Sequence, residues 1–366
     1  MTGPRRVLAV NAGSSSLKLR VLDGDQVAAS RDLPVAADGF DTAALADFVA
    51  GVRVDAVGHR VVHGGTRFTA PTRLDDEVLQ ALRELTDLAP LHQPASLAGI
   101  DAVGAALPQL PSVASFDTAF HATLPAAAST YAVPKQWRDR WQVRRYGFHG
   151  LSHAYASRRA AELVARPLTD LRVVVCHLGA GASLCAVGGG RSVDTTMGFT
   201  PLEGLVMATR SGSVDPGLVL WLQQQAGLGA AEIADALEHR SGLLGLGGSA
   251  DLQVLLARVE GGDAPARLAV DVYQHRLVAG VAAMTAALGG LDVLVFTGGV
   301  GEHAASVRQD AADRLAFLGV HVDPALNDGP GTDAEIGPGE AAVRTFVVQA
   351  REDLEIARGV RVALGG

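Results

Sequence analysis

Three features that would indicate other classes of protein are scarce in this chain: cysteine, long apolar runs and clustered positive charge. Cys176 and Cys185 are the only cysteines, and both lie in apolar strand-like surroundings. They cannot build a disulfide framework, so we expect two buried thiols. No apolar segment is long enough to span a bilayer, so we expect no membrane partner. The formal net charge is −8 without a strongly basic stretch, which argues against nucleic acid as a partner.

The first ten residues, MTGPRRVLAV, contain two arginines but only a short apolar run before Asn11. That run is too short for the core of a signal peptide. We therefore expect a cytoplasmic protein.

Several familiar motifs are also missing. No glycine-rich segment ends in GK[ST], as a P-loop does, and no GxGxxG precedes a helix. His149 and His153 have the spacing of two residues on one helix face, which could suit a metal. However, HExxH is absent and no third ligand is near in the sequence. The sequence therefore does not predict a structural metal at these histidines.

The length and composition indicate a well-packed protein of two domains. The chain has 366 residues, of which 48% are hydrophobic and 19% charged. Patterns of apolar residues predict strands that end in glycine-rich turns, and several helices. The helices are expected at 41–49, 75–88, 96–107, 218–225, 230–239, 270–288 and from Glu352 onward. The nearly uncharged stretch 270–288 is interpreted as a buried core helix.

Two hairpin patterns suggest an internal duplication. RVLAVNAGSSSLKLRVLDGDQV and LRVVVCHLGAGASLCAVGGGRSVD each contain a buried strand, a polar residue, a turn of small residues and a return strand. The polar residues are Asn11 and His177. We infer two α/β domains with the same core, each opening with a hairpin whose turn faces a shared cleft.

The glycine-rich turns are candidates for phosphate binding, because small residues let backbone N–H groups approach an anion closely. AGSSS, HLGAGAS and FTGGVGE qualify, and HGG and LGLGGS are weaker candidates. One such loop alone is more often a plain turn. Three at corresponding strand ends predict a ligand there, since α/β proteins bind ligands at strand ends and between domains.

Few charged residues stand out as candidates, and some of them have a simpler alternative. Arg60 lies in the apolar context VGHRVVHGG and needs a partner or a ligand. Asp117 ends an apolar strand, where it could be catalytic or cap a turn. Arg210 lies between turn-forming residues. Lys18 could be an outward-facing lysine on a hairpin, and Glu352 could cap a helix.

Ten motifs in order carry a resemblance that no single motif would. They are NAGSSSLK, GHRVVHGG, LAPLHQPAS, FDTAFH, RYGFHGLSH, HLGAGAS, DTTMGFTPLEG, TRSGSVDPG, FTGGVGE and REDLEIA. Together they closely resemble the acetate kinases, which belong to the superfamily of acetate and sugar kinases, heat-shock ATPases and actin. The resemblance runs from Val7 to about Ala357.

The resemblance implies an α/β fold of two duplicated actin-like (ribonuclease H-like) domains. Each would have a mixed sheet flanked by helices, with an active-site cleft between the domains. Residues 1–119 and 354–366 would form the first domain, with the first hairpin and the acyl and phosphate side. Residues 120–353 would form the second, with the nucleotide loops and the dimerisation surface.

The resemblance also implies reversible phosphoryl transfer from ATP to acetate, giving ADP and acetyl phosphate. The enzyme would thus be a phosphotransferase with a carboxyl group as acceptor. It would require Mg²⁺, with Mn²⁺ as an alternative. The family further implies a homodimer, for which we expect the helix at 270–288 to supply the contact.

Four residues match the family's catalytic positions. Arg60 and Arg210 would hold the acyl carboxylate and the transferring phosphate, to which the planar guanidinium is suited. His149 would donate to the phosphoryl oxygens in the transition state. Asp117 would orient the acetate or the metal.

Other positions match the family's binding residues. Asn11 and Glu352 would be magnesium ligands, because Mg²⁺ prefers hard oxygen donors. The pocket for the acetate methyl group would comprise Val62, Leu91, Phe148 and Pro201. The nucleotide and phosphate side would comprise Ser14, Ser16, Lys18, His177, Leu178, Gly179, Ala180, Gly181, Asp251, Leu252, Gln253, Gly299, Val300, Gly301, Glu302 and His303.

Three departures from the family pattern fall on the nucleotide side. Ala180 and His303 each stand where the family usually has asparagine, and Gln253 stands where arginine is usual. One lost hydrogen bond to a charged group is worth about 1.5–3 kcal/mol. We therefore hypothesise an active acyl kinase with altered use of nucleotide or phosphoryl donor. The alternatives are a propionate or other short-chain acyl kinase, a non-kinase ATPase switch, and an inactive homologue on the same fold.

Overall fold

The computed structural model describes residues 3–13, 16–36, 39–88, 93–329 and 331–365. The chain forms two compact units. Unit 1 comprises Met1–Ala122, Phe148–Tyr155 and Arg351–Gly366, and unit 2 comprises Thr123–Gly147 and Ala156–Ala350. Compared with the division expected from the sequence, the segment Phe148–Tyr155 lies with unit 1. Its Leu151 packs in the same apolar cluster as Ile356, which explains this placement.

Unit 1 contains a seven-stranded mixed sheet in the order β4-β3-β2-β1-β5-β7-β6. Strands β1, β2 and β3 form an antiparallel meander, and β5 and β7 continue the sheet parallel to β1. The short strands β4 and β6 pair antiparallel at the edges. The bounds are β1 (Arg6–Ala12), β2 (Ser16–Asp23), β3 (Gln26–Ala36), β4 (Gly39–Phe40), β5 (Ala56–Val61), β6 (Thr72–Arg73) and β7 (Ser112–Phe116).

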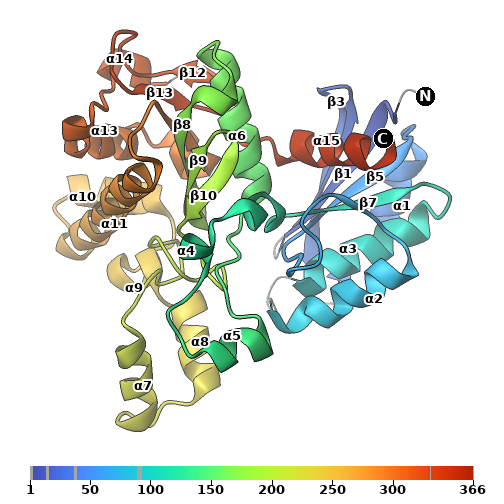
Figure 1. Ribbon diagram of the computed structural model, residues 1–366, viewed down its shortest axis with the longest axis horizontal. Coiled ribbons are helices and arrows are strands. Elements are labelled where there is room, and N and C mark those ends of the chain that lie inside the picture. Colours follow the sequence, from blue (N-terminus) through green and yellow to red (C-terminus); the bar gives the residue numbers. More distant parts are fainter. Residues whose placement is uncertain (1–2, 14–15, 37–38, 89–92, 330, 366) are drawn as a thin grey trace. The chain divides into compact units, whose positions relative to one another are not determined.

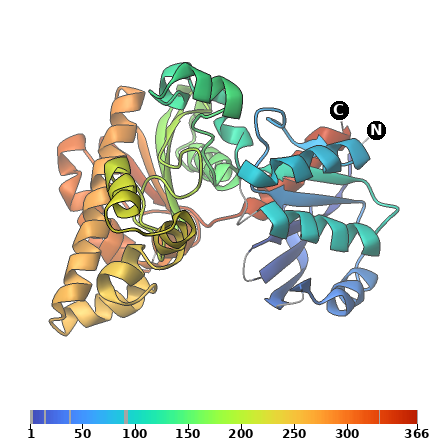
Figure 2. The same ribbon diagram turned by 90° about the horizontal axis from the view of Figure 1, so that it is seen from below.

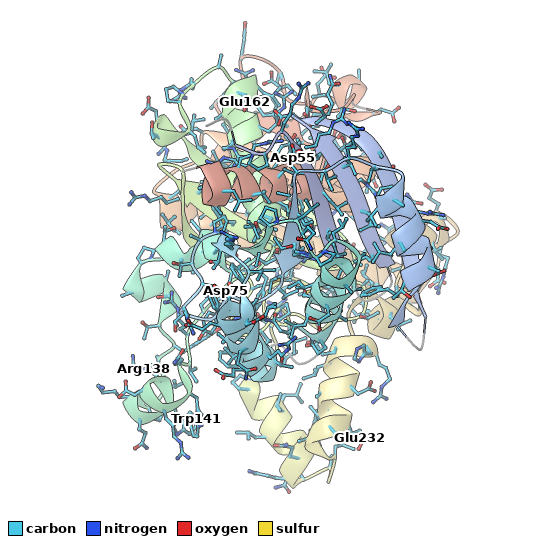
Figure 3. The ribbon with its side chains drawn as sticks, turned by 90° about the vertical axis from the view of Figure 1, so that its right-hand side faces the viewer. Asp55, Asp75, Arg138, Trp141, Glu162 and Glu232 are labelled. Atoms are coloured by element: carbon cyan, nitrogen blue, oxygen red, sulfur yellow. The ribbon has the colours of Figure 1, made fainter. Side chains whose placement is uncertain are left out.

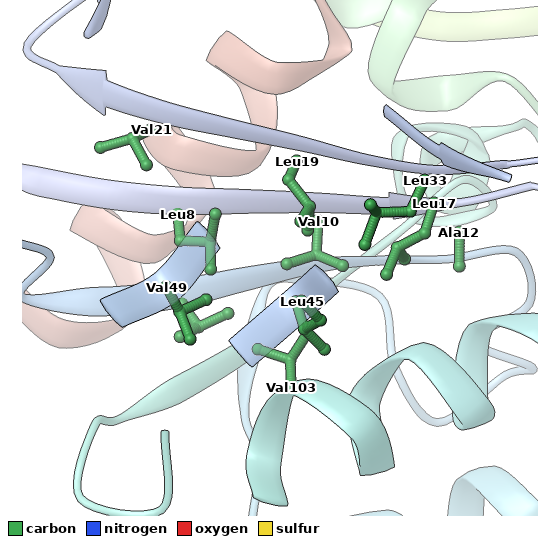
Figure 4. Packing of buried hydrophobic residues seen from close by; sticks show 11 residues of the cluster. Leu8, Val10, Ala12, Leu17, Leu19, Val21, Leu33, Leu45, Val49 and Val103 are labelled. Atoms are coloured by element: carbon green, nitrogen blue, oxygen red, sulfur yellow. The ribbon is translucent and has the colours of Figure 1, made fainter. Parts of the chain in front are cut away.

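Helices cover both faces of this sheet (Figure 1). They are α1 (Thr42–Ala50), α2 (Asp76–Glu84), α3 (Gln93–Ala106) and α15 (Glu352–Gly365). Successive residues of β1 point to opposite faces, as strand geometry requires. Leu8 and Val10 pack in one cluster with Leu45 of α1 and Val103 of α3 (Figure 4). Val7 packs on the other face, in the cluster that includes α15.

Unit 2 repeats this topology in a six-stranded sheet of order β10-β9-β8-β11-β13-β12. Strands β8, β9 and β10 form the antiparallel meander, β11 and β13 follow parallel to β8, and β12 pairs antiparallel at the edge. This match to β1–β2–β3–β5–β7–β6 confirms the predicted duplication. The bounds are β8 (Arg172–Leu178), β9 (Ala182–Gly188), β10 (Arg191–Thr195), β11 (Val293–Thr297), β12 (Ala334–Glu335) and β13 (Arg344–Val347).

The longest helix of unit 2, α11 (Ala264–Leu288), packs along strands β8, β9 and β10 (Figure 2). Val270, Leu277 and Val281 are buried on its inner side, which confirms the core helix expected there. The other helices are α4 (Ala126–Ser129), α5 (Lys135–Trp141), α6 (Gly150–Leu163), α7 (Pro216–Gln224), α8 (Ala230–His239), α9 (Gly242–Gly247), α10 (Leu252–Glu260), α12 (Gly298–His303), α13 (Ala305–Arg314) and α14 (Pro324–Asn327). Helix α6 begins in unit 1 and continues in unit 2.

Two local expectations need correction. The helix expected at 75–88 ends at Glu84, and Leu85–Leu88 form a 3₁₀ turn. The segment after β11 was expected to be a glycine loop, but Gly298–His303 form the short helix α12. The carboxylate of Glu302 accepts a hydrogen bond from the Gly298 N–H and thereby stabilises the first turn.

Surface helices carry exposed aromatic side chains. Trp141 projects from α5 near Arg138 (Figure 3) and is 51% exposed. Across the described residues, every helix is too short or too polar to cross a membrane.

Candidate active site

Arg60 and Asp117 lie side by side at the carboxyl ends of two parallel strands in unit 1. Arg60 is in β5 and pairs in register with Ser115 of β7, and Asp117 follows Ser115 by two residues, directly after the end of β7. The Arg60 Nε lies 3.1 Å from both carboxylate oxygens of Asp117, and its Nη2 lies 2.6 Å from Oδ2. Asp117 is buried and Arg60 is mostly buried. The predicted catalytic arginine and aspartate of this unit therefore form one ion pair.

Asn11 and Glu352 join the same cluster. The Arg60 Nη1 donates to Asn11 Oδ1 at 3.1 Å, and the Asn11 Nδ2 donates to Glu352 Oε2 at 2.8 Å. The Arg60 Nε also lies 3.8 Å from Glu352 Oε2. Asn11 reaches the cluster because β1 pairs parallel with β5, and Glu352 reaches it as the first residue of α15. Four residues distributed over 342 positions of sequence thus meet at one end of the sheet.

The charges of this cluster shift one another's protonation. Burial raises the pKa of Asp117, while the Arg60 guanidinium opposes that shift. Burial alone would lower the pKa of Arg60, but the carboxylates of Asp117 and Glu352 outweigh burial and leave that pKa raised. Arg60 is therefore a permanent cation that is anchored on one side by carboxylates.

His149 lies just before α6 rather than on it, so the expected shared helix face with His153 is not formed. Its backbone is in the left-handed region, with φ of 57°. This conformation lets the His149 N–H reach the Asp117 side chain, and the Gly150 N–H donates to the Asp117 carbonyl at 2.9 Å. The rings of His149 and His153 are 6.5 Å apart. Among the described residues, no group of three or more His, Cys, Asp or Glu side chains is placed to hold a metal.

The first hairpin brings Lys18 beside the same cluster. Asn11 of β1 and Lys18 of β2 are cross-strand partners, so their side chains leave the sheet on the same face. Leu17 and Leu19 point to the opposite face, into the core. The turn itself is closed by a hydrogen bond from the Gly13 N–H to the Ser16 carbonyl. Ser14, which the sequence also implicates, lies outside the described residues.

The expected methyl pocket is only partly described. Val62 and Phe148 are both buried in unit 1. The Phe148 ring meets the His63 ring edge-on at 5.6 Å, and the His121 Nε2 lies 3.0 Å from the Phe148 carbonyl. Burial lowers the pKa of His63 to about 4, so this side of Phe148 is lined by a neutral imidazole at pH 7. Leu91 lies outside the described residues, and Pro201 belongs to unit 2.

In unit 2, the two main glycine segments lie next to each other. His177–Gly181 spans the end of β8 and the turn to β9, Gly298–His303 follows β11, and β8 and β11 are parallel neighbours with Thr297 opposite His177. A Cβ atom at Gly298 would lie 2.8 Å from the Leu178 carbonyl oxygen, and its φ is 78°. Only glycine allows this approach without strain. The structure thus joins these two segments, as the sequence predicts for strand-end loops.

The remaining predicted residues of unit 2 are held by their neighbours. The Arg210 Nε pairs with Glu238 at 2.9 Å, and its Nη1 lies 3.5 Å from the Pro201 carbonyl. Asp251 caps α10 by accepting from the Gln253 N–H at 2.8 Å. The Ala180 carbonyl accepts from the Ala208 N–H at 3.1 Å.

Sequence reasoning missed a polar cluster next to Pro201. The Glu203 carboxylate accepts from Arg145 Nη2 at 2.7 Å and from the Tyr131 hydroxyl. That hydroxyl also accepts from the Phe199 N–H at 2.9 Å, and Arg145 Nη1 donates to the carbonyls at 196 and 197. These side chains fix the path of residues 196–204. The only signal was Glu203 inside DTTMGFTPLEG, because Tyr131 and Arg145 lie in another part of the chain.

Known proteins match this chain over most of its length. Residues 40–358 match the model of the acetokinase family. An acetate kinase of Gloeobacter violaceus is 52% identical over 83% of this chain and 76% of its own length. An acetate kinase of Streptomyces griseus is 45% identical over 99% of this chain and 97% of its own.

Solved structures of similar length also superpose on this chain. The acetate kinase of Porphyromonas gingivalis aligns with a TM-score of 0.89 and 36% identity, covering 98% of this chain and 99% of that one. A propionate kinase of Francisella tularensis aligns with a TM-score of 0.89 and 35% identity, covering 97% of this chain and 98% of that one.

Proposed function

Because the chain belongs to the acetokinase family, we propose that it transfers a phosphoryl group reversibly from ATP to acetate, giving ADP and acetyl phosphate. The observation that carries this proposal is the cluster of Arg60, Asp117, Asn11 and Glu352. It offers an anchored cation for anionic oxygens and hard oxygen donors for a divalent cation. Phosphoryl transfer needs mainly such positioning and charge stabilisation, not a covalent step on the protein.

Arg60 is assigned to the carboxylate of acetate and to the phosphoryl group. Asp117 holds the guanidinium through Nε and Nη2, so the orientation of Arg60 does not have to be established when the substrate binds. The acetate is already ionised at neutral pH, so Asp117 need not act as a base. We assign Asp117 to orienting Arg60 and His149, whose imidazole would donate to the phosphoryl oxygens.

The donor set of unit 1 fits Mg²⁺. The Asn11 Nδ2 donates to Glu352 Oε2, so the side-chain oxygens of these two residues lie in one cluster, and two carboxylates outnumber the single guanidinium there. Mg²⁺ binds few protein oxygens and keeps waters or phosphates as its other ligands, and Mn²⁺ accepts the same ligands. Bound there, the ion would neutralise phosphate charge. Asn11 and Glu352 would hold it, and Lys18 and Ser16 would lie on the phosphate side.

Unit 2 is assigned to the nucleotide. The segments 177–181 and 299–303 present backbone groups at the ends of β8 and β11, a usual place for nucleotide phosphates in α/β proteins. Asp251 to Gln253 at the start of α10 would lie toward the adenosine. Arg210, anchored by Glu238, would bind the transferring phosphoryl group.

The test is formation of acetyl phosphate, trapped as the hydroxamate, from ATP, Mg²⁺ and acetate. We expect product with the parent protein and at least a 100-fold lower kcat for Arg210→Ala, because lost charge stabilisation costs about 10²–10³ in rate. Hydrolysis of ATP at the same rate without acetate would instead support a nucleotide-operated switch. Absence of both activities would support an inactive homologue.

A second candidate is preference for propionate, since a propionate kinase of Francisella tularensis has a similar structure. One methylene in an apolar pocket is worth only about 1–3 kcal/mol. We expect the kcat/KM for acetate to exceed that for propionate by about 10-fold, with both acids accepted. The reverse order would identify a propionate kinase.

Altered donor use remains part of the proposal. Ala180, Gln253 and His303 are all exposed, so a ligand can reach them. Each stands where the family usually has a different side chain, asparagine at 180 and 303 and arginine at 253. Initial rates with ATP, GTP and pyrophosphate measure the donor preference. A strong preference for ATP with ordinary affinity would contradict the altered-donor idea.

A homodimer and a cytoplasmic location complete the proposal. Leu218, Leu220 and Trp221 of α7 are 45%, 54% and 55% exposed, which supports an apolar contact surface. Helix α11 uses much of its apolar surface inside unit 2, so α7 is the better candidate surface. Light scattering after gel filtration should give twice the chain mass of 37.7 kDa, and Trp221→Lys should shift the measured mass toward that of the monomer.

The cytoplasmic location is supported by the two cysteines, which are both free, as is usual in a reducing compartment. Cell fractionation tests this location.

A further inference from the structure

One carboxylate oxygen joins the start of the glycine helix α12 to the end of unit 2. The Glu302 Oε1 accepts from the Gly298 N–H at 3.0 Å and from the Ala350 N–H at 3.0 Å. Gly298 is the first residue of α12 and directly precedes the segment 299–303 that is assigned to the nucleotide. Ala350 is the last residue of unit 2, and the chain reaches Glu352 two positions later. Since a single oxygen serves both amides, neither segment can shift without breaking a charge-assisted hydrogen bond.

Glu302 is itself held in place by a buried cation. The Arg308 Nη1 donates to the carbonyls of Gly301 and Glu302, both at 2.9 Å. Its Nε donates to Asn327 Oδ1 at 2.7 Å and its Nη2 to the Asn327 carbonyl at 2.8 Å. Arg308 is only 1% exposed. A buried guanidinium with these four hydrogen bonds to neutral oxygens fixes the end of α12, and with it the base of the Glu302 side chain.

The chain leading to Glu352 is anchored at three successive amides. The Val348 N–H donates to the Phe296 carbonyl at 2.9 Å, the Gln349 N–H to Asp333 Oδ1 at 2.9 Å, and the Ala350 N–H to Glu302. The first two anchors belong to the sheet and to a turn. The third is the only one of these that depends on the glycine helix.

We propose that Glu302 is a positioning residue that holds the nucleotide segment against Val348–Ala350, the stretch of unit 2 that leads along the chain to the proposed metal ligand Glu352. This inference rests on the proposed function, because that function assigns ATP to Gly299–His303 and the metal to Glu352. The family resemblance places Glu302 in the nucleotide loop but assigns its side chain no role. Here both hydrogen bonds of Oε1 go to the protein's own backbone.

The test compares Glu302→Ala with Glu302→Gln. The glutamine amide oxygen can accept from both N–H groups but has no charge. This variant therefore distinguishes the effect of the two hydrogen bonds from the effect of the negative charge. For Glu302→Ala we expect a rise of about 10-fold or more in both the KM for ATP and the Mg²⁺ concentration for half-maximal rate, with the KM for acetate within about 2-fold. Glu302→Gln should recover most of each loss. Glu260→Ala, an exposed change at the end of α10, is the matched control.

Hydrogen–deuterium exchange reports on positioning without using activity. Peptides covering 298–303 and 348–352 should exchange faster in Glu302→Ala than in the parent, and nearly as slowly as the parent in Glu302→Gln. The proposal is overturned if Glu302→Gln loses ATP affinity while both peptides stay protected, since the charge would then act on the ligand. Unchanged exchange in Glu302→Ala would also overturn it. If Glu302→Ala does not fold, the ATP affinity and the hydrogen exchange of Glu302→Gln still test the proposal. Absence of acetyl phosphate with the parent protein would instead refute the proposed function.

Discussion

The guanidinium of Arg60 holds the buried carboxylate of Asp117 through two of its nitrogens, with Nη2 2.6 Å from Oδ2. This pair links β5 to the end of β7 and supplies the fixed cation of the proposed site. It is also the place where function and stability are most directly connected, because Asp117 is only 1% exposed.

Arg60→Ala should therefore damage both activity and stability. We expect a loss of about 3–5 kcal/mol in the free energy of unfolding at pH 7, since a buried carboxylate loses its partner. Without Arg60, burial keeps the pKa of Asp117 above its unfolded value near 3.9. A raised native pKa means that stability is lost as pH rises, so the deficit should shrink toward pH 4. Urea unfolding at pH 4–8 measures this.

The matched control is Arg83→Ala. Arg83 pairs with Asp101 at 3.2 Å, but the two side chains are 48% and 56% exposed. Such a pair is worth about 0–1 kcal/mol. If Arg60→Ala and Arg83→Ala lose the same free energy of unfolding, burial of Asp117 does not make its ion pair more stabilising than an exposed one.

Gly58→Ala should displace α15 and with it Glu352. An added Cβ would lie 2.5 Å from Ile356 Cγ2 and 2.7 Å from Val360 Cγ2. Overpacking of this kind costs about 1–3 kcal/mol. We expect a lower midpoint of thermal unfolding and a higher Mg²⁺ requirement. Gly104→Ala in α3 is the control, because its Cβ would meet no atom within 4 Å and should stabilise the helix by about 0.5–1 kcal/mol.

The buried histidines of unit 1 should make stability depend on pH. Burial lowers the pKa of His59 to about 3 and of His63 to about 4, while unfolded histidine titrates near 6.5. Between these values the unfolded chain binds more protons, so stability should fall as pH falls from about 6.5 toward 4. The slope should be up to about 1.4 kcal/mol per pH unit for each histidine.

His59→Gln isolates one of these contributions. Glutamine does not titrate, so the slope below pH 6.5 should become shallower by about 1.4 kcal/mol per pH unit, whatever the stability at pH 8. His275→Gln on the exposed side of α11 is the surface control. An unchanged slope in His59→Gln would show that His59 is protonated in the folded protein.

Glu352→Gln should weaken the proposed Mg²⁺ site. Loss of the carboxylate charge should raise the Mg²⁺ concentration for half-maximal rate by about 10–100-fold, with the KM for acetate little changed. The Asn11 N–H still has an oxygen acceptor in this variant, so unfolding should change little. Chelator titration of the parent gives the reference, and Glu340→Gln at an exposed position is the control. Identical Mg²⁺ curves for Glu352→Gln and the parent would place the metal elsewhere.

Local features of both sheets could be predicted from sequence because they depend on neighbours in the chain. The buried runs at Val7–Val10 and Val173–Cys176 allow strand formation, and the small residues after them allow only tight turns. The duplication followed from the same pattern. Arg60 and Asp117 were recognisable as candidates because charge in an apolar strand context demands a partner.

The partners themselves were not predictable in this way. Asn11 donates to Glu352 across 341 positions, and Glu302 reaches Ala350 across 48. The burial of Arg308 could not be predicted from the sequence, because an arginine in a helix is usually solvated and no local pattern indicates that this side of α13 is buried. The helical turn at Gly298–His303 likewise depends on the Glu302 carboxylate returning to the Gly298 amide.

The sequence by itself determined the class of fold, the family and the chemical types of the candidate residues, since these follow from short motifs and their order. Only the tertiary structure decided that Arg60, Asp117, Asn11 and Glu352 share one cluster, and that Glu302 serves backbone amides. The physical reason is strand register. Parallel pairing of β1, β5 and β7 brings Asn11, Arg60 and Asp117 to one end of the sheet, and α15 adds Glu352; no local pattern encodes which residues will meet there.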